Sequence, residues 1–215
     1  MAEVEQSDPE QDVEQSDPEQ DAERAALEQA VFARLRRESG HSDAFAYLVT
    51  AGDRDELGRV LTAPGQPLWA RELAAFRLGV AGDPRAFESL VLFLNHREPA
   101  RCASAAHALA RLGDPRTARA AAALATNELR VAYALHPVRL LTDLRAPESV
   151  PALVTTLERR LRRPHDPYGK VALACVEGLG ALGDRRARPV LEQALGHPPL
   201  AAAAAGALAR IPQQR

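Results

Sequence analysis

Apolar residues recur at intervals of three or four on both sides of a short break, and this pattern returns about every thirty residues. The breaks are centred on Gly52, Gly82, Gly113, Arg145 and Gly183. Four residues before each centre stands a leucine: Leu48, Leu78, Leu109, Leu141 and Leu179. Eight residues after each centre stand Val60, Leu90, Ala121, Leu153 and Leu191. Because spacings of three and four keep residues on one face of an α-helix, each unit is predicted to be a pair of amphipathic helices.

The break carries residues that end one helix and begin the next. In Leu-Gly-Asp-Pro-Arg, residues 112–116, glycine can adopt the left-handed conformation, aspartate can cap the next helix, and proline fits its first turn. Residues 145–147 read Arg-Ala-Pro, so we expect this turn to be less sharply defined. Pro137 falls inside the predicted first helix of that unit, residues 127–143, and is expected to kink it.

These units resemble the short bacterial HEAT-like repeats, including those grouped under the phycobilisome lyase label. The resemblance rests on the alanine-rich first helix, the phrase Leu-Gly-Asp-Pro-Arg and the apolar end of the second helix, and it covers about residues 41–212. It implies an all-α fold, a right-handed α-solenoid of about five helix pairs whose second helices line the concave side. Residues 22–38, with Leu27, Val31 and Leu35 on one stripe, are predicted to form an extra helix that closes the stack.

Composition favours the same fold class. Of the 215 residues 46% are apolar but only 4% are aromatic, so the core must consist of small and medium aliphatic side chains, which suits closely packed helices. The two cysteines, Cys102 and Cys175, are too few for a disulfide framework and are expected to be core residues. No apolar run is long enough to span a membrane, and the acidic start is unlike a signal peptide. We therefore expect a cytoplasmic protein without a membrane partner.

The first residues form an acidic tail. Residues 4–12, VEQSDPEQD, are repeated at once in residues 13–21, and residues 1–21 are expected to be disordered, ahead of a repeat domain at 22–215. Residues 1–24 hold ten acidic residues and one arginine, which leaves a net charge of +7 for the remaining chain. The tail either competes with an anionic partner for the basic body or simply solvates the chain.

The sequence predicts no catalytic residue, no metal ligand and no cofactor. Six histidines are scattered over different units, and the chain lacks the His-Glu dipeptides of HEAT-like di-iron hydroxylases. HEAT-like DNA glycosylases combine a basic face with aromatic residues, and this alternative stays open because the body is basic. However, Trp69, Tyr133 and Tyr168 belong to different units.

A candidate binding site lies where the repeat period lengthens to 38 residues. The extra residues fall in ERRLRRPHDPYGK, residues 158–170, and repeat proteins place such insertions in edge loops. The candidate residues are Arg159, Arg160, Arg162, Arg163, His165, Tyr168 and Lys170, extended by Arg185, Arg186 and Arg188. We expect this basic edge to dock an acidic protein segment or, as the alternative, a nucleic-acid backbone. A second interpretation is that the arginines only stabilise the carboxyl end of a helix.

The carboxyl-terminal segment, PPLAAAAAGALARIP, contains no charged residue before Arg210. Because terminal repeats usually expose a polar face, this helix is expected to self-associate, to dock a partner or to form an inert end. Taken together, the sequence predicts a non-catalytic scaffold or adaptor that binds another protein.

Overall fold

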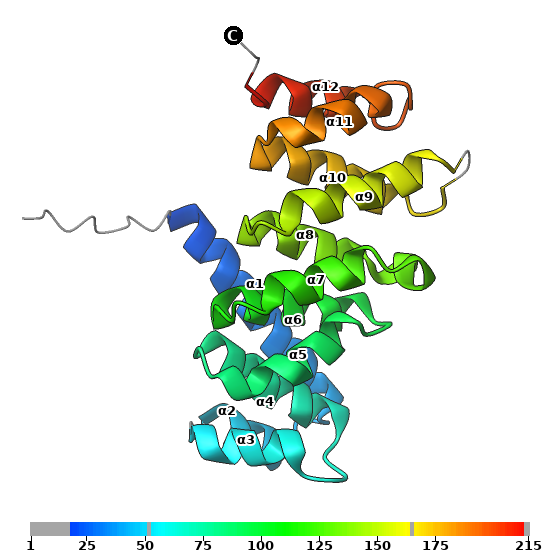
Figure 1. Cartoon of the computed structure of the whole chain (residues 1–215). Coiled ribbons are helices and arrows are strands. Elements are labelled where there is room, and N and C mark those ends of the chain that lie inside the picture. Colours follow the sequence, from blue (N-terminus) through cyan, green and yellow to red (C-terminus); the bar gives the residue numbers. More distant parts are fainter. Residues whose placement is uncertain (1–17, 51–52, 164–165, 213–215) are drawn as a thin grey trace, which may run out of the picture.

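The computed structural model describes residues 18–50, 53–163 and 166–212, and all regular structure in these ranges is helical (Figure 1). The α-helices are α1 (Pro18–Glu38), α2 (Asp43–Thr50), α3 (Arg54–Thr62), α4 (Leu68–Val80), α5 (Phe87–Leu94), α6 (Pro99–Leu112), α7 (Thr117–Ala125), α8 (Leu135–Leu144), α9 (Ser149–Leu161), α10 (Gly169–Leu182), α11 (Arg188–Ala194) and α12 (Ala201–Arg210). There are also three short 3-10 helices in these ranges: η1 (Pro84–Ala86), which precedes α5, η2 (Glu128–Tyr133), which precedes α8, and η3 (Arg185–Ala187), which precedes α11.

The helices from α2 onward pair and stack in chain order, from α2 and α3 at one end to α12 at the other (Figure 1). The even-numbered helices are the first helices of their units, and α4, α6, α8 and α10 each contact the next first helix along the stack, which ends with α12. The odd-numbered helices from α3 onward are the second helices; α7 contacts α9, and α9 contacts α11. The expected all-α solenoid of helix pairs is thereby confirmed.

One continuous core runs through the stack. The leucines four residues before each turn and the apolar residues eight after it are all buried, as the repeat pattern predicts. Glycine and alanine let neighbouring first helices approach closely. At Gly180 of α10 an added Cβ would lie 2.7 Å from the Cβ of Ala207 in α12, so this helix pair has no room for a larger side chain.

The turns follow the predicted roles. Gly82, Gly113 and Gly183 have positive φ, and the aspartate after each of them accepts a hydrogen bond from the backbone N–H two residues on. The expectation of a loose turn at residues 145–147 was wrong. Arg145 adopts the left-handed conformation itself, with φ of 49°, and the buried Ser149 hydroxyl donates to the Leu141 carbonyl at 2.6 Å. A side-chain hydrogen bond thus compensates for the missing glycine and aspartate.

Pro137 does not kink a long helix, because residues 127–143 do not form one. They form η2, which ends at Tyr133, and α8, which begins at Leu135. Pro137 is the third residue of α8 and is buried. Backbone N–H groups of a first turn have no partner within the helix, so proline costs little there.

The extra amino-terminal helix is present, but it does not close the end of the stack. Helix α1 packs across the first helices α4 and α6 and lies behind them in Figure 1. Its Phe32 meets Phe76 edge-on, with 5.9 Å between ring centroids, and Phe76 stacks on His107. Phe76 and His107 stand six residues before the centres of their turns, and Arg139 of α8 and Glu177 of α10 stand at the same repeat position. Helix α1 does not reach these two residues, and both are exposed. Helix α1 therefore covers this repeat position where it holds the rings of Phe76 and His107, and leaves it open where it holds charged residues.

The predicted tail falls mostly in residues 1–17, which lie outside the described residues. Helix α1 begins at Pro18, three residues before the predicted end of the tail.

Candidate functional site

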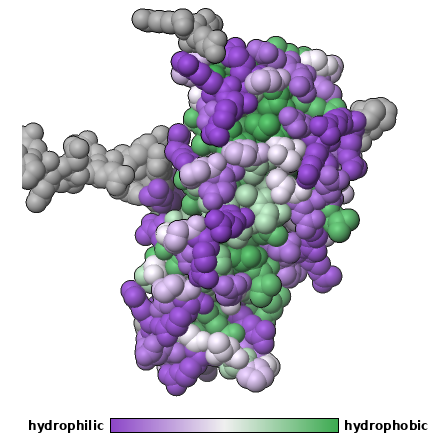
Figure 2. Space-filling model, viewed as in Figure 1, coloured by the Kyte–Doolittle hydropathy of each residue, from purple (hydrophilic) through white to green (hydrophobic). Residues whose placement is uncertain are grey.

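The second helices present a row of small and apolar side chains to solvent. Thr62, Leu92, Ala123 and Thr155 share one position, ten residues after the centre of their turns, and Leu92 is 73% exposed. We call these four residues, together with Gly58 and Pro151, the stripe. Figure 2 shows apolar and weakly polar surface along this face, between two hydrophilic margins. In the last unit the same position is the polar Gln193, so the band of small and weakly polar side chains around the exposed Leu92 ends there. A solvent-facing band of this kind is a candidate interaction surface.

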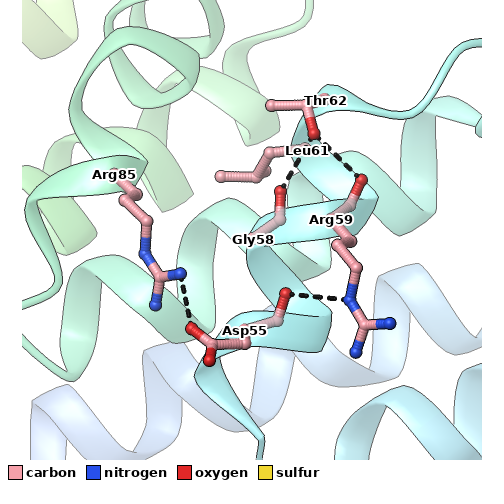
Figure 3. A pocket seen from close by; sticks show the side chains of 6 residues that line it. All are labelled: Asp55, Gly58, Arg59, Leu61, Thr62 and Arg85. Carbon is pink, nitrogen blue, oxygen red and sulfur yellow. Dashed lines mark hydrogen bonds and ion pairs between the residues drawn. The ribbon is translucent and has the colours of Figure 1, made fainter.

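Two shallow hollows interrupt the stripe. The first, of about 500 Å³, lies between α3 and η1 and is lined by Asp55, Gly58, Arg59, Leu61, Thr62 and Arg85 (Figure 3). The Arg85 guanidinium reaches from the second unit toward α3 and donates to Asp55 at 2.8 Å. A Cβ on Gly58 would lie 3.0 Å from that guanidinium, so the glycine leaves room for it.

The second hollow, of about 450 Å³, lies between α7 and α9. Its lining is less charged and consists of Ala122, Pro147, Glu148, Pro151, Ala152 and Thr155. Both hollows open on the same face, so an extended segment that lay along the stripe could place side chains into each of them.

One margin of this face is the turn edge, formed by the turns inside the units. There the arginine of the repeated phrase has a role that the sequence did not reveal. Each guanidinium contacts both carboxylate oxygens of the aspartate two residues before it, in the pairs Arg85 with Asp83, Arg116 with Asp114 and Arg186 with Asp184. This contact lowers the pKa of all three aspartates.

Two of these arginines also join neighbouring units. Arg85 bonds to Asp55 of the preceding unit, and Arg116 bonds to Glu88 at 3.2 Å. The Arg116 guanidinium also lies 3.9 Å from the centroid of the Phe87 ring. The turn edge is therefore basic in composition, but much of its charge is used within the solenoid.

The opposite margin is the loop edge, formed by the loops between units, and it holds the predicted binding segment. Two of the predicted residues are structural. Arg159 donates to the Thr126 carbonyl at 2.5 Å and pairs with Glu128. Arg160 is buried and lies 3.5 Å from Asp166. The interpretation of arginines that stabilise the carboxyl end of a helix fits Arg159, which bonds to the end of α7, whereas Arg160 forms a buried ion pair with a loop residue.

The other residues of the segment remain available to a partner. Arg162, Arg163, Tyr168 and Lys170 are exposed, and the Arg162 side chain is 76% exposed. His165 lies outside the described residues. The exposed part of the predicted basic edge thus consists of two arginines, a lysine and a tyrosine around the start of α10.

Arg185, Arg186 and Arg188 do not extend this edge, contrary to expectation. They lie beyond the far end of α10, at the turn edge, whereas Lys170 is the second of the 14 residues of that helix. At a rise of 1.5 Å per residue the separation is about 20 Å. Arg188 is also engaged with the Ile211 carbonyl and with Glu192.

A cluster that the sequence analysis missed lies under α1. Glu72 of α4 and Arg101 of α6 are only 2% and 5% exposed, and both pair with charged residues of α1. The partners are 29 to 63 residues apart in sequence, in helices whose packing the repeat pattern does not specify. The local signals were two short-range pairs, Arg34 with Glu38 four residues on and Arg101 with Glu98 three residues before it.

The cysteines are buried and free, as expected of core residues. Burial raises the pKa of both the Cys102 and the Cys175 thiol, which disfavours the reactive thiolate. Within the described residues, no group of three or more His, Cys, Asp or Glu side chains is placed to hold a metal ion. None of the described helices is both long and apolar enough to cross a membrane.

Comparison with known families supports the repeat type. The family model described as the PBS lyase HEAT-like repeat matches residues 171–197. That range contains most of α10, the turn at Gly183 and all of α11, which is one complete unit. No curated protein matches the chain. The match identifies a HEAT-like repeat in this protein, and the other units show the same order of helix, turn and helix.

Proposed function

We propose that this protein is a non-catalytic scaffold or adaptor that binds a segment of another protein along its second helices. The observation that carries the proposal is the stripe, a solvent-facing band of small and weakly polar side chains with two hollows, between charged margins (Figure 2). HEAT-like repeats stack into extended surfaces of this kind, which suit elongated ligands.

The proposed ligand is an extended segment with small apolar side chains and acidic residues. Small side chains suit hollows that are shallow and open, and acidic residues suit the exposed cations at the loop edge. Arg162, Arg163 and Lys170 supply these cations, and Tyr168 adds an aromatic surface beside them. Arginine and carboxylate form charge-assisted hydrogen bonds, which give orientation as well as affinity.

The experiment is affinity purification from the native cell, with the full chain as bait, followed by direct binding of the captured protein. One variant, Leu92→Asp with Ala123→Asp, disrupts the stripe at two exposed positions. A second, Arg162→Glu with Arg163→Glu, reverses the loop edge and leaves the structural Arg159 and Arg160 intact. The matched control, Arg36→Glu with Arg37→Glu, makes the same charge change on α1, away from this face.

We expect the control to bind the captured partner as the wild type does and both other variants to bind it at least tenfold more weakly. Equal binding by all four proteins would contradict the proposal. Nucleic acid is the competing ligand, and it is tested by retention of the same proteins on duplex DNA at low salt. Retention that the loop-edge variant loses and the stripe variant keeps would favour nucleic acid instead.

A further inference from the structure

Helix α1 is held on α4 and α6 by a connected set of charges, of which Glu72 and Arg101 are buried. Glu72 accepts hydrogen bonds from Arg34 of α1, from Arg101 and, at 2.6 Å, from the Ser104 hydroxyl. Glu38 of α1 accepts from Arg34 at 2.9 Å and from Arg101 at 2.7 Å. Arg34 and Glu38 of α1 thus form one network of ion pairs with Glu72 and Arg101 on the surface beneath the helix.

We call that surface the seat; it comprises Glu72, Phe76, Arg101, Ser104 and His107. Without α1, Glu72 keeps Arg101 and Ser104, and Arg101 keeps Glu72 and Glu98, but Arg34 and Glu38 are lost as partners. The seat therefore favours a helix that presents this charge pattern, because a buried charge that loses a partner is destabilised. Arg34 and Glu38 satisfy its charges, Phe32 covers Phe76, and Glu28 lies 3.3 Å from His107. Burial disfavours the Glu38 carboxylate, but hydrogen bonds from Arg101 and Arg34 outweigh this effect and lower its pKa. The helix with this pattern is α1 itself.

Helix α1 is also separable from the helix that follows it in sequence. Its main contacts are with α4 and α6, which belong to the second and third helix pairs, and not with α2 of the first pair. Residues 39–42 join it to α2, and within them both Gly40 and His41 have positive φ, 65° and 58°. Glycine tolerates this conformation, whereas histidine pays a steric cost, so the closed hinge stores strain.

We propose that two copies of this chain exchange α1, so that the α1 of each copy occupies the seat of the other. The exchange keeps every contact between α1 and the seat, and an extended hinge releases the strain at His41. A second copy carries the required pattern of arginine, glutamate and phenylalanine by definition. Because α1 must leave its own seat first, the monomer and the dimer interconvert slowly. This interface lies on the face opposite the stripe, so it is independent of the proposed function.

Complementary full-length variants provide the test. Arg34→Glu replaces the α1 residue that pairs with Glu72 by a like charge and leaves the seat unchanged. Glu72→Arg places a like charge against Arg34 in the seat and leaves α1 unchanged. Each variant alone is expected to be a monomer with an undocked α1, as shown by fast amide exchange in residues 28–38. After mixing, native mass spectrometry should detect a one-to-one heterodimer, because the intact α1 of one copy can occupy the intact seat of the other. A mixture that stays monomeric at high concentration would overturn the proposal.

A hinge series keeps the test independent of how well Glu72→Arg folds. Deletion of Gly40 and His41 prevents α1 from folding back, so light scattering should report twice the mass of the 23.2 kDa chain. Insertion of six Gly and Ser residues after His41, and separately His41→Gly, should lower the dimer fraction of the wild-type chain several-fold. A hinge deletion that remains monomeric, or a wild-type dimer that the insertion does not change, would show that any association uses another surface, such as α12.

Discussion

The arginines of two turns, Arg85 and Arg116, join their helix pairs to the pair before. Arg85 and Arg116 hold the capping aspartate of their own turn and also an acidic residue of the preceding unit. The repeated phrase therefore sets the spacing between units as well as the boundary within them. The roles of glycine, aspartate and proline could be predicted, because they depend on local backbone geometry. The role of arginine could not, since its second partner is about thirty residues away.

Replacement of Asp114 by asparagine isolates the charge of this contact. Asparagine can still accept from the Arg116 N–H, so the cap is kept and only the ion pair is lost. The Arg116 guanidinium lowers the pKa of Asp114, so the carboxylate stabilises the fold above pH about 4 and loses this effect as the pH falls further. We expect Asp114→Asn to have a lower urea midpoint than the wild type at pH 7, and this difference should become smaller as the pH falls below about 4. An equal gap at pH 7 and below pH about 4 would contradict this assignment.

Arg145 offers a test of backbone strain at the one turn in the repeat that lacks glycine. A left-handed conformation costs a non-glycine residue about 1–2 kcal/mol, and the greater unfolded-state entropy of glycine offsets part of this gain. Arg145→Gly should therefore stabilise the protein by about 0.5–1 kcal/mol. Gly113→Ala, at a turn with the same geometry and no steric contact, should destabilise it by about as much. Thermal unfolding of both variants measures the two shifts, which must have opposite signs.

At the level of helices, close contact between small residues fixes how first helices pack. Gly180 lies against Ala207, and Gly79 lies against Ala108, so glycine in one helix faces alanine in the next. The periodic apolar positions predicted which residues enter the core and where each helix turns. They did not predict that Pro137 would stand in a first turn, because a 3-10 segment before α8 takes up part of the expected helix.

Gly180→Ala tests whether this contact sets the position of α12. The added methyl group would lie 2.7 Å from the Ala207 Cβ and 2.8 Å from its Cα, so the backbone of α12 must shift. Overpacking of this kind costs about 1–3 kcal/mol. Gly206→Ala is the matched control, since nothing lies within 4 Å of its added Cβ and alanine favours a helix by about 1 kcal/mol. Amide exchange in α12 should become faster in the first variant and slower in the second.

The position of α1 shows what a repeat pattern leaves undetermined. Its helical character follows from the apolar helix face formed by Leu27, Val31 and Leu35, of which Val31 and Leu35 are buried and Leu27 is partly buried. Its place across α4 and α6 depends on Glu72 and Arg101, which belong to the sequence of other units. A single sequence gives no means of matching charges across such distances, so α1 was predicted at the end of the stack.

At the level of the whole molecule, the same limit applies to the predicted basic edge. Its arginines were grouped by sequence, but α10 places them at opposite margins of the molecule. Arg159, Arg160 and Arg188 are then engaged with helix ends or buried carboxylates. Charge counts therefore overstate the cationic surface that a partner can reach, and the loop edge is smaller than the sequence suggests.

The acidic tail provides a final test of how much of that charge is free. Residues 1–17 hold seven acidic residues and no basic ones, so their removal changes the net charge from −2 to +5. If the tail screens the body, the shortened chain should elute from heparin, a general polyanion, at a clearly higher salt concentration than the full chain. A full-length control in which the seven acids become asparagine or glutamine should elute with the shortened chain. Unchanged elution of both would contradict a screening role and favour the interpretation that the tail only solvates the chain.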